Sequence, residues 1–158
     1  MGVPIWLGVS RSLESVLQRI PGEILRVPAS IFCKRIIGHR HTERLIKRFT
    51  AYSLRFASQR NLCNSHHDIQ QKTCRWLLST ADRIHSLRLR VTHSWLAHML
   101  GVRRQSITQV TRELQTTGII DSRRGQIQIL DRKRVEALSC ECYWETKSLY
   151  ERLVRPAL

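Results

Sequence analysis

A basic and amide-rich run, residues 103–109, holds the side chains best suited to chemistry with a partner. Arginine donates two parallel hydrogen bonds to guanine O6 and N7, and glutamine pairs in the same bidentate way with adenine N6 and N7. The run Arg-Arg-Gln-Ser-Ile-Thr-Gln contains no acid, whereas a helix face selected only for solubility more often carries Glu and Lys. The chemistry predicted is recognition of base edges in DNA, with an ordinary solvated face as the alternative. The predicted base-reading residues are Arg104, Gln105, Thr108 and Gln109.

The apolar residues within and after this run predict how it is presented. Ile107, Val110 and Leu114 recur at intervals of three and four, which is the period of a helix with one buried face. We expect this helix to cover residues 104–117 and to end at Gly118. The positions not needed for its buried face are Arg103, Arg104, Gln105, Ser106, Thr108, Gln109, Thr111 and Arg112.

A second short helix is predicted directly upstream. Thr92 is a suitable N-cap, and Gly101 is placed where a left-handed C-terminal stop would lie. The apolar face between them consists of Trp95, Leu96, Met99 and Leu100. Two short helices around a glycine-containing turn predict a helix-turn-helix unit.

A basic hairpin follows this unit. Ile119 and Ile120 precede a polar turn at residues 121–125, and Ile127 and Ile129 then alternate with glutamines, so the pattern predicts two short strands. Such a hairpin after a helix-turn-helix is called a wing. Its cations and several neighbouring polar residues are predicted to contact DNA phosphates, which fixes register without reading sequence. These residues are Thr92, His93, Arg103, Ser106, Arg112, Arg123, Arg124 and Gln126.

The stretch of residues 40–64 predicts a long helix with a narrow apolar stripe. Its members are spaced by four, three and four residues, which is the spacing of a heptad seam between two helices: Leu45, Phe49, Tyr52 and Phe56. We expect this seam to pair two copies of the chain. The alternative is an amphipathic helix packed on its own domain.

The segments around these elements are less distinctive. A helix is expected to begin near Ser65, with Asp68 as its capping-box acid. Leu87 and Leu89 alternate with arginines and suggest a short strand, and Asp131 is expected to cap a last short helix. A further strand around residues 18–29 is suggested by Ile24, Leu25 and Val27.

The composition narrows the class of partner. The chain has 158 residues, with 27 Lys and Arg against 12 Asp and Glu, which gives a formal net charge of +15. Such an excess favours a polyanionic partner, because the binding of phosphates releases counterions. The opening residues carry no basic segment of a signal peptide, and no apolar run approaches the length needed to span a bilayer. We expect a cytoplasmic, nucleoid-associated protein with no membrane contact and with reduced cysteines.

Enzymatic and metal-binding interpretations are less well supported. The scattered histidines lack a matched acid and a Gly-x-Ser-x-Gly turn, so the chain is not expected to be an enzyme. A metal site could be imagined from Cys63, His66, His67, Cys140 and Cys142. Their short spacings, Cys-x2-His and Cys-x-Cys, do not match the paired spacing of a zinc module. We therefore expect buried, reduced cysteines, with no metal and no cofactor.

Several stretches resemble transcription regulators of the bacterial Crp/Fnr family. The similarity is carried by residues 63–78, by Val91-Thr-His-Ser-Trp-Leu-Ala-His-Met-Leu-Gly-Val-Arg-Arg-Gln-Ser-Ile-Thr-Gln, and by residues 113–120 and 123–131. The resemblance implies a homodimer, a winged helix-turn-helix and a palindromic DNA target, with RNA polymerase as a further candidate partner. It also implies that most of the family's effector-binding β-roll is missing. The family's frequent reading set Arg-Glu-x-x-x-Arg is Arg104-Gln105-x-x-x-Gln109 here, so the usual half-site sequence is not carried over.

The predicted fold is mostly α (α+β): a winged helix-turn-helix preceded by a long dimerisation helix and a short β remnant. The expected divisions are the remnant at 1–38, the dimerisation helix at 39–64, the DNA-binding domain at 65–143 and a C-terminal tail at 144–158. The predicted function is sequence-specific, dimeric transcription regulation through double-stranded DNA. Two alternatives remain: a non-specific binder of RNA or nucleoid DNA, and a truncated partner that forms mixed dimers with a full-length regulator.

Overall fold

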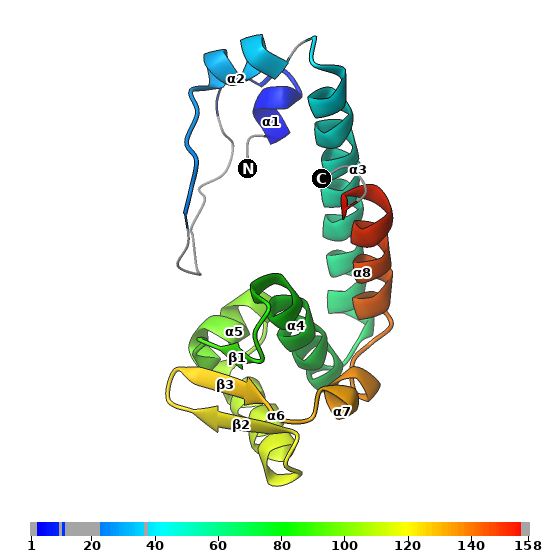
Figure 1. The fold of residues 1–158 in the computed structure, drawn as a ribbon. Coiled ribbons are helices and arrows are strands. Elements are labelled where there is room, and N and C mark those ends of the chain that lie inside the picture. Colours follow the sequence, from blue (N-terminus) through cyan, green and yellow to red (C-terminus); the bar gives the residue numbers. More distant parts are fainter. Residues whose placement is uncertain (1–2, 10, 12–22, 37, 156–158) are drawn as a thin grey trace. The chain divides into compact units, whose positions relative to one another are not determined.

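The fold was analysed in a computed structural model that describes residues 3–9, 11, 23–36 and 38–155 (Figure 1). The chain divides into two compact units, residues 55–150 in one and residues 1–54 with 151–158 in the other. The helices are α1 (Val3–Trp6), α2 (Ala29–Ile36), α3 (Arg40–His66), α4 (Ile69–Ile84), α5 (His93–Leu100), α6 (Arg104–Thr116), α7 (Arg132–Ala137) and α8 (Cys142–Leu153). The strands are β1 (Arg88–Leu89), β2 (Ile120–Arg123) and β3 (Gln126–Ile129).

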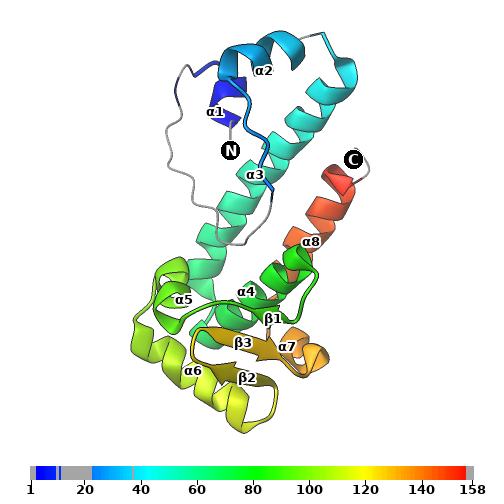
Figure 2. The same ribbon diagram turned by 60° about the vertical axis from the view of Figure 1, so that its left-hand side comes forward.

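The unit of residues 55–150 is built on a small antiparallel sheet with the order β1-β3-β2 (Figure 2). Leu89 pairs with Ile127 across β1 and β3, and Ile120 pairs with Ile129 across β2 and β3. The helices α4, α5 and α6 contribute the other side of one continuous core. Its fully buried members include Leu77, Leu89, Leu96, Ile107, Leu114, Ile120, Ile127, Ile129, Val135 and Tyr143. This arrangement of helices and sheet confirms the predicted mostly α winged helix-turn-helix.

Helix α4 begins later than the sequence predicted. Asp68 is its N-cap, accepting a hydrogen bond from the backbone N–H of Gln71 at 2.7 Å. The Gln71 side chain accepts one in return from the backbone N–H of Asp68 at 3.2 Å, so the two form a reciprocal capping box. The expected start near Ser65 is therefore wrong, because Ser65 still lies within α3.

The hairpin of β2 and β3 has a tighter turn than expected. Arg123 pairs with Gln126, which leaves only Arg124 and Gly125 to make the turn. Gly125 has a φ of 76°, a conformation that a side chain would strain. The polar segment at 121–123, predicted as turn, is part of strand β2. The wing is therefore short and regularly paired up to its tip.

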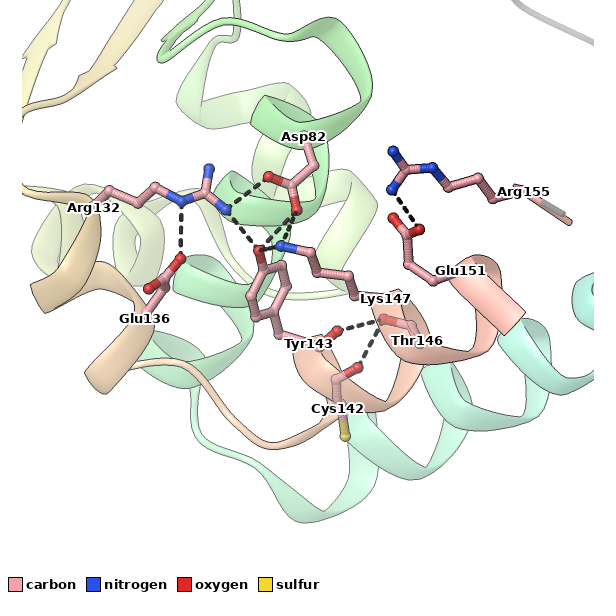
Figure 3. A network of polar contacts seen from close by, with 9 residues as sticks. All are labelled: Asp82, Arg132, Glu136, Cys142, Tyr143, Thr146, Lys147, Glu151 and Arg155. Atoms are coloured by element: carbon pink, nitrogen blue, oxygen red, sulfur yellow. Dashed lines mark hydrogen bonds and ion pairs between the residues drawn. The ribbon is translucent and has the colours of Figure 1, made fainter. Parts of the chain in front are cut away.

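The segment 144–158, which was predicted as a C-terminal tail, contains most of the helix α8. Tyr143 at its start is 1% exposed, and its hydroxyl donates to Asp82 Oδ2 at 2.7 Å (Figure 3). Arg132 of α7 reaches the other carboxylate oxygen of Asp82 at 2.7 Å, and Lys147 Nζ lies 3.7 Å from Oδ2. These contacts join α4, α7 and α8. Thr146, within the predicted tail, is 7% exposed, so part of α8 beyond residue 143 is buried.

Burial of Asp82 would by itself raise the pKa of its carboxyl group. The hydrogen bonds from Tyr143 and Arg132, with the positive charges of Arg132 and Lys147, outweigh that effect and hold the pKa below its usual value. The carboxylate is therefore ionised at neutral pH and is the centre of the contacts between these helices.

The expected strand near the N-terminus is absent from the residues that the structure describes. Glu23–Pro28 has no regular secondary structure, Leu25 is 95% exposed, and Ala29–Ile36 forms the helix α2. Residues 18–22 of the expected strand lie outside the described residues. The long helix predicted at 40–64 is present as α3. Among the described helices, none is long and apolar enough to cross a membrane.

Candidate nucleic-acid interface

Helix α6 packs against the core with its apolar face and exposes its polar face to solvent. Ile107 is 0% exposed and Leu114 is 2% exposed, so the helix is held in the core along one face. Arg104, Gln105 and Gln109 are exposed. The structure therefore places three of the four predicted base-reading residues outward on one helix.

The preceding helix α5 is set by the two caps that the sequence predicted. Thr92 is the N-cap, and its hydroxyl accepts from the backbone N–H of Trp95 at 3.2 Å. Gly101 is the C-cap with a φ of 65°, where a side chain would be strained. Arg103, at the N-cap position of α6, makes no side-chain capping hydrogen bond. The turn between α5 and α6 is thus fixed by glycine rather than by a cap on α6.

His93 links both helices of the unit to the wing. Its Nδ1 lies 3.2 Å from the hydroxyl of Thr108 on α6. Its Nε2 lies 3.1 Å from the hydroxyl of Ser122 on β2 and 3.3 Å from that of Thr111. Both ring nitrogens are therefore engaged within the chain. His93 therefore positions α6 and the wing, and its contact with a DNA phosphate stays a prediction.

The surroundings of His93 favour its neutral form. Partial burial lowers the pKa of the imidazole, and the positive charge of Arg104 lowers it further. The Thr108 hydroxyl also donates to the Arg104 carbonyl at 3.1 Å, so this half-buried side chain is less available to bases than its helix position suggested.

Thr111 is a buried residue that the sequence analysis placed on the outer face. It is 1% exposed, and its hydroxyl donates to the Ile107 carbonyl at 2.8 Å. Helical spacing predicts that Thr111 lies on the buried face, because it is four residues after Ile107 and three before Leu114. The sequence did not predict Ser122 as a partner of His93. The alternation of polar and apolar residues along β2 does not indicate this contact.

Gln109 already has a partner within the chain. Its Nε2 donates to Glu113 Oε1 at 3.1 Å, one helical turn further along α6. Both residues are exposed, so this contact is open to exchange with an external group. Glu113 is the acid on this helix that lies beyond the acid-free run at 103–109.

The predicted phosphate contacts occupy the borders of α6 and the hairpin. Arg103, Arg112 and Arg124 are exposed, and Ser106 and Gln126 are partly buried. Arg123 is also exposed, and its Nε donates to Asp121 Oδ2 at 2.8 Å. An exposed ion pair of this kind contributes little stability, so the guanidinium can exchange it for a phosphate.

Comparison with known proteins places these elements in a family of domains. Residues 71–138 match the family model of the Crp-like helix-turn-helix domain. Among solved structures, the chain is similar to a protein from Eubacterium rectale assigned to the Crp/Fnr family of transcriptional regulators. The identity is 28% and the TM-score 0.52, over 70% of this chain and 51% of that one. This chain therefore spans about half the length of that protein.

The catabolite activator protein of Thermus thermophilus is a more distant neighbour. Its identity is 14% and its TM-score 0.41, over 75% of this chain and 47% of that one. A search of curated protein sequences gives no match. The predicted resemblance is confirmed by the domain match, which includes α5, α6 and the hairpin: residues 71–138 match a Crp-like helix-turn-helix domain.

Proposed function

We propose that this chain is a transcription regulator that reads double-stranded DNA with α6 in the major groove. The observation that carries the proposal is the outward set Arg104, Gln105 and Gln109 on a helix whose opposite face is locked into the core of a Crp-like domain. Arginine and glutamine on such a helix match the hydrogen-bonding edges of guanine and adenine.

The wing and the helix borders supply contacts to phosphates in this proposal. Arg103, Arg112, Arg123 and Arg124 are exposed cations around the reading face. Residues 101–135 hold eight Lys and Arg against three acids, whereas residues 136–158 hold three against four. The positive charge is therefore concentrated in the segment proposed to meet DNA.

Dimerisation through α3 completes the proposal. Leu45, Phe49, Tyr52 and Phe56 share one stripe of this helix, and Phe49 is 37% exposed. The rings of Phe49 and Tyr52 are 6.2 Å apart, whereas the Arg83 guanidinium lies 5.2 Å from the Phe56 ring. The chain itself thus contacts Phe56, and we assign the pairing contact to the stripe as a whole, with the exposed Phe49 ring within it. Two copies paired in this way would read a palindromic site.

Selection of bound duplexes from a random pool tests the reading of sequence. Arg104→Ala should relax preference at one base position and weaken binding by about 1–3 kcal/mol there. Arg124→Ala should weaken all duplexes alike and flatten the salt dependence. Lys133→Ala, an exposed cation on α7, is the matched control and should change neither quantity.

Equal, salt-dependent losses from Arg104→Ala and Arg124→Ala would contradict sequence reading. That result would favour the second candidate function, non-specific binding of RNA or nucleoid DNA, which the net charge of +15 supports. Competition between the selected duplex and random RNA separates the two functions.

The dimer is tested by Phe49→Lys, which should yield monomers by light scattering and remove cooperative binding to the two half-sites. Ala51→Lys places the same charge at an exposed position outside the stripe and should leave the dimer intact. A Phe49→Lys chain that stays dimeric would refute the assigned contact. Mixed dimers recovered with a full-length regulator would instead support the role of a truncated partner.

A further inference from the structure

The end of α3 and the start of α8 bring together four side chains that are scattered in the sequence, here called the Cys3His cluster: Cys63, His67, Cys140 and Cys142. Their sulfur atoms and one histidine nitrogen all lie within 4.8 Å of one another. Cys63 is in α3, His67 follows that helix directly, Cys140 is in the loop after α7, and Cys142 is the first residue of α8. We propose that this cluster is a structural zinc site.

The separations within the cluster match those of zinc ligands. Zn–S bonds of about 2.3 Å and a Zn–N bond of about 2.0–2.1 Å in a tetrahedron place two sulfurs about 3.8 Å apart, and a sulfur and a nitrogen about 3.6 Å apart. Cys63 Sγ lies 3.6 Å from Cys140 Sγ, and Cys142 Sγ lies 3.7 Å from His67 Nδ1. Two of the six separations thus match a tetrahedral site, and all six lie within 4.8 Å.

Two further side chains hold the ligands as the outer shell of a metal site does. His67 Nε2 lies 3.0 Å from Glu141 Oε1, which leaves Nδ1 facing the sulfur atoms. A carboxylate on the second nitrogen of a metal-binding histidine fixes its tautomer and orientation. Gln59 Nε2 lies 3.1 Å from Cys142 Sγ and can donate to a thiolate there. An ordinary cluster of buried thiols needs neither contact.

The electrostatics of the surroundings suit a site with a net negative charge. Three thiolates and a neutral imidazole around Zn²⁺ leave one excess negative charge. Arg75 is 4% exposed, and its Nε has no hydrogen-bond partner among the described residues, so this buried guanidinium keeps an unsatisfied donor. The charge of Arg75 acts on the Cys63 sulfur, so this cation is placed where it can offset the negative charge of the site.

The donor set and its burial indicate a structural site. Three cysteines and one histidine form one of the ligand sets typical of structural zinc. Cys63 is 0% exposed, and Cys140 and Cys142 are each 2% exposed. All four positions around the metal would be filled by the protein, which leaves none for a substrate. Zinc would then cross-link the end of α3 to the start of α8 and to the loop before it, where Cys140 lies 77 residues after Cys63.

Metal analysis of the full chain, purified without an affinity tag, tests the site. We expect one zinc per chain that survives dialysis, and a cobalt(II) form with the visible absorption of tetrahedral thiolate coordination. Cys140→Ser and His67→Gln should bind zinc at least 10-fold more weakly, measured by competition with a chromophoric chelator. His66→Gln, at the exposed neighbouring histidine, and Cys33→Ser, outside the cluster, are the matched controls and should keep full affinity.

Glu141→Gln keeps all four ligands and leaves the core untouched, since Glu141 is exposed. Loss of this outer-shell partner should weaken zinc binding about 10-fold or more. A folded wild-type chain that takes up no zinc or cobalt overturns the proposal, as does a Cys63–Cys140 disulfide in its place. Full zinc affinity in Cys140→Ser would overturn it as well. None of these measurements uses DNA, so they stand apart from the proposed function.

Discussion

The outer face of α6 and the contacts around Asp82 use similar side chains in opposite ways. On α6, Arg104 and Gln105 are exposed, and their hydrogen-bonding groups face solvent. Around Asp82, a carboxylate, a guanidinium, a phenol and an ammonium group contact one another. The first arrangement leaves bonding capacity for a partner, and the second uses it to hold helices together. Substitutions in the two regions should therefore separate binding from stability.

The underside of α6 should give the largest effect. Ile107→Ala removes a fully buried side chain beneath the reading face and should lower the free energy of unfolding by about 2–5 kcal/mol. Urea denaturation measures this loss. Gln105→Ala, on the exposed face of the same helix, should stay within about 0.5 kcal/mol of the wild type while weakening DNA binding. A large loss of stability in Gln105→Ala would contradict the assignment of the exposed face of α6 to binding rather than to stability.

Asp82→Asn should give the next largest effect. It keeps the shape of the side chain but removes the charge that Arg132 and Lys147 share, at a cost of about 1–2 kcal/mol in unfolding free energy. Because the folded-state pKa of Asp82 is lowered, its contribution is present above the unfolded pKa and is lost as the pH falls through the acid range. Glu151→Gln, which disrupts an exposed pair with Arg155, is the control and should change stability little. An Asp82→Asn variant as stable as the wild type would show that these contacts do not hold the helices.

The smallest effect on stability is expected at His93, which makes hydrogen bonds within the chain directly beside the exposed face of α6. Its folded-state pKa is lowered, so the neutral ring stabilises the fold above the unfolded pKa, and that stabilisation is lost as the pH falls through the folded pKa. His93→Gln should therefore show a shallower loss of stability from pH 7 to pH 5 than the wild type. His98→Gln, at an exposed position on the same helix, should keep the wild-type slope. Equal slopes for all three proteins would remove the role assigned to the ring.

The helix-turn-helix could be predicted because its signals are local. Thr92 and Gly101 mark both ends of α5, and the spacing of Ile107, Val110 and Leu114 sets the orientation of α6. Each of these features depends on neighbours a few residues away. The same reasoning misplaced Thr111, since a hydroxyl that bonds a carbonyl within its own helix can be buried without an external partner.

The sequence suggests a metal group that includes Cys63, His67, Cys140 and Cys142 but does not favour it, because the signals of the Cys3His cluster and of the face of α8 are not local. The sequence shows Cys63 and Cys140 far apart, and only the packing of α8 on the end of α3 brings their sulfur atoms within 3.6 Å. Because the spacing along the sequence matches no paired zinc module, the sequence alone favours buried, reduced cysteines. The expected strand near Leu25 failed for the converse reason: an apolar triplet favours a strand only where a neighbouring strand can pair with it, and Leu25 is 95% exposed.

The hydrogen bond between Gln109 and Glu113 has a consequence for how α6 would discriminate among DNA sequences. A base edge must replace Glu113 as the acceptor for the Gln109 amide, so its gain is only the difference between two hydrogen bonds. Where the DNA offers no better acceptor, the amide can stay folded back on its own helix and leave no buried donor unsatisfied. That position would then tolerate several bases, whereas Arg104 would demand one.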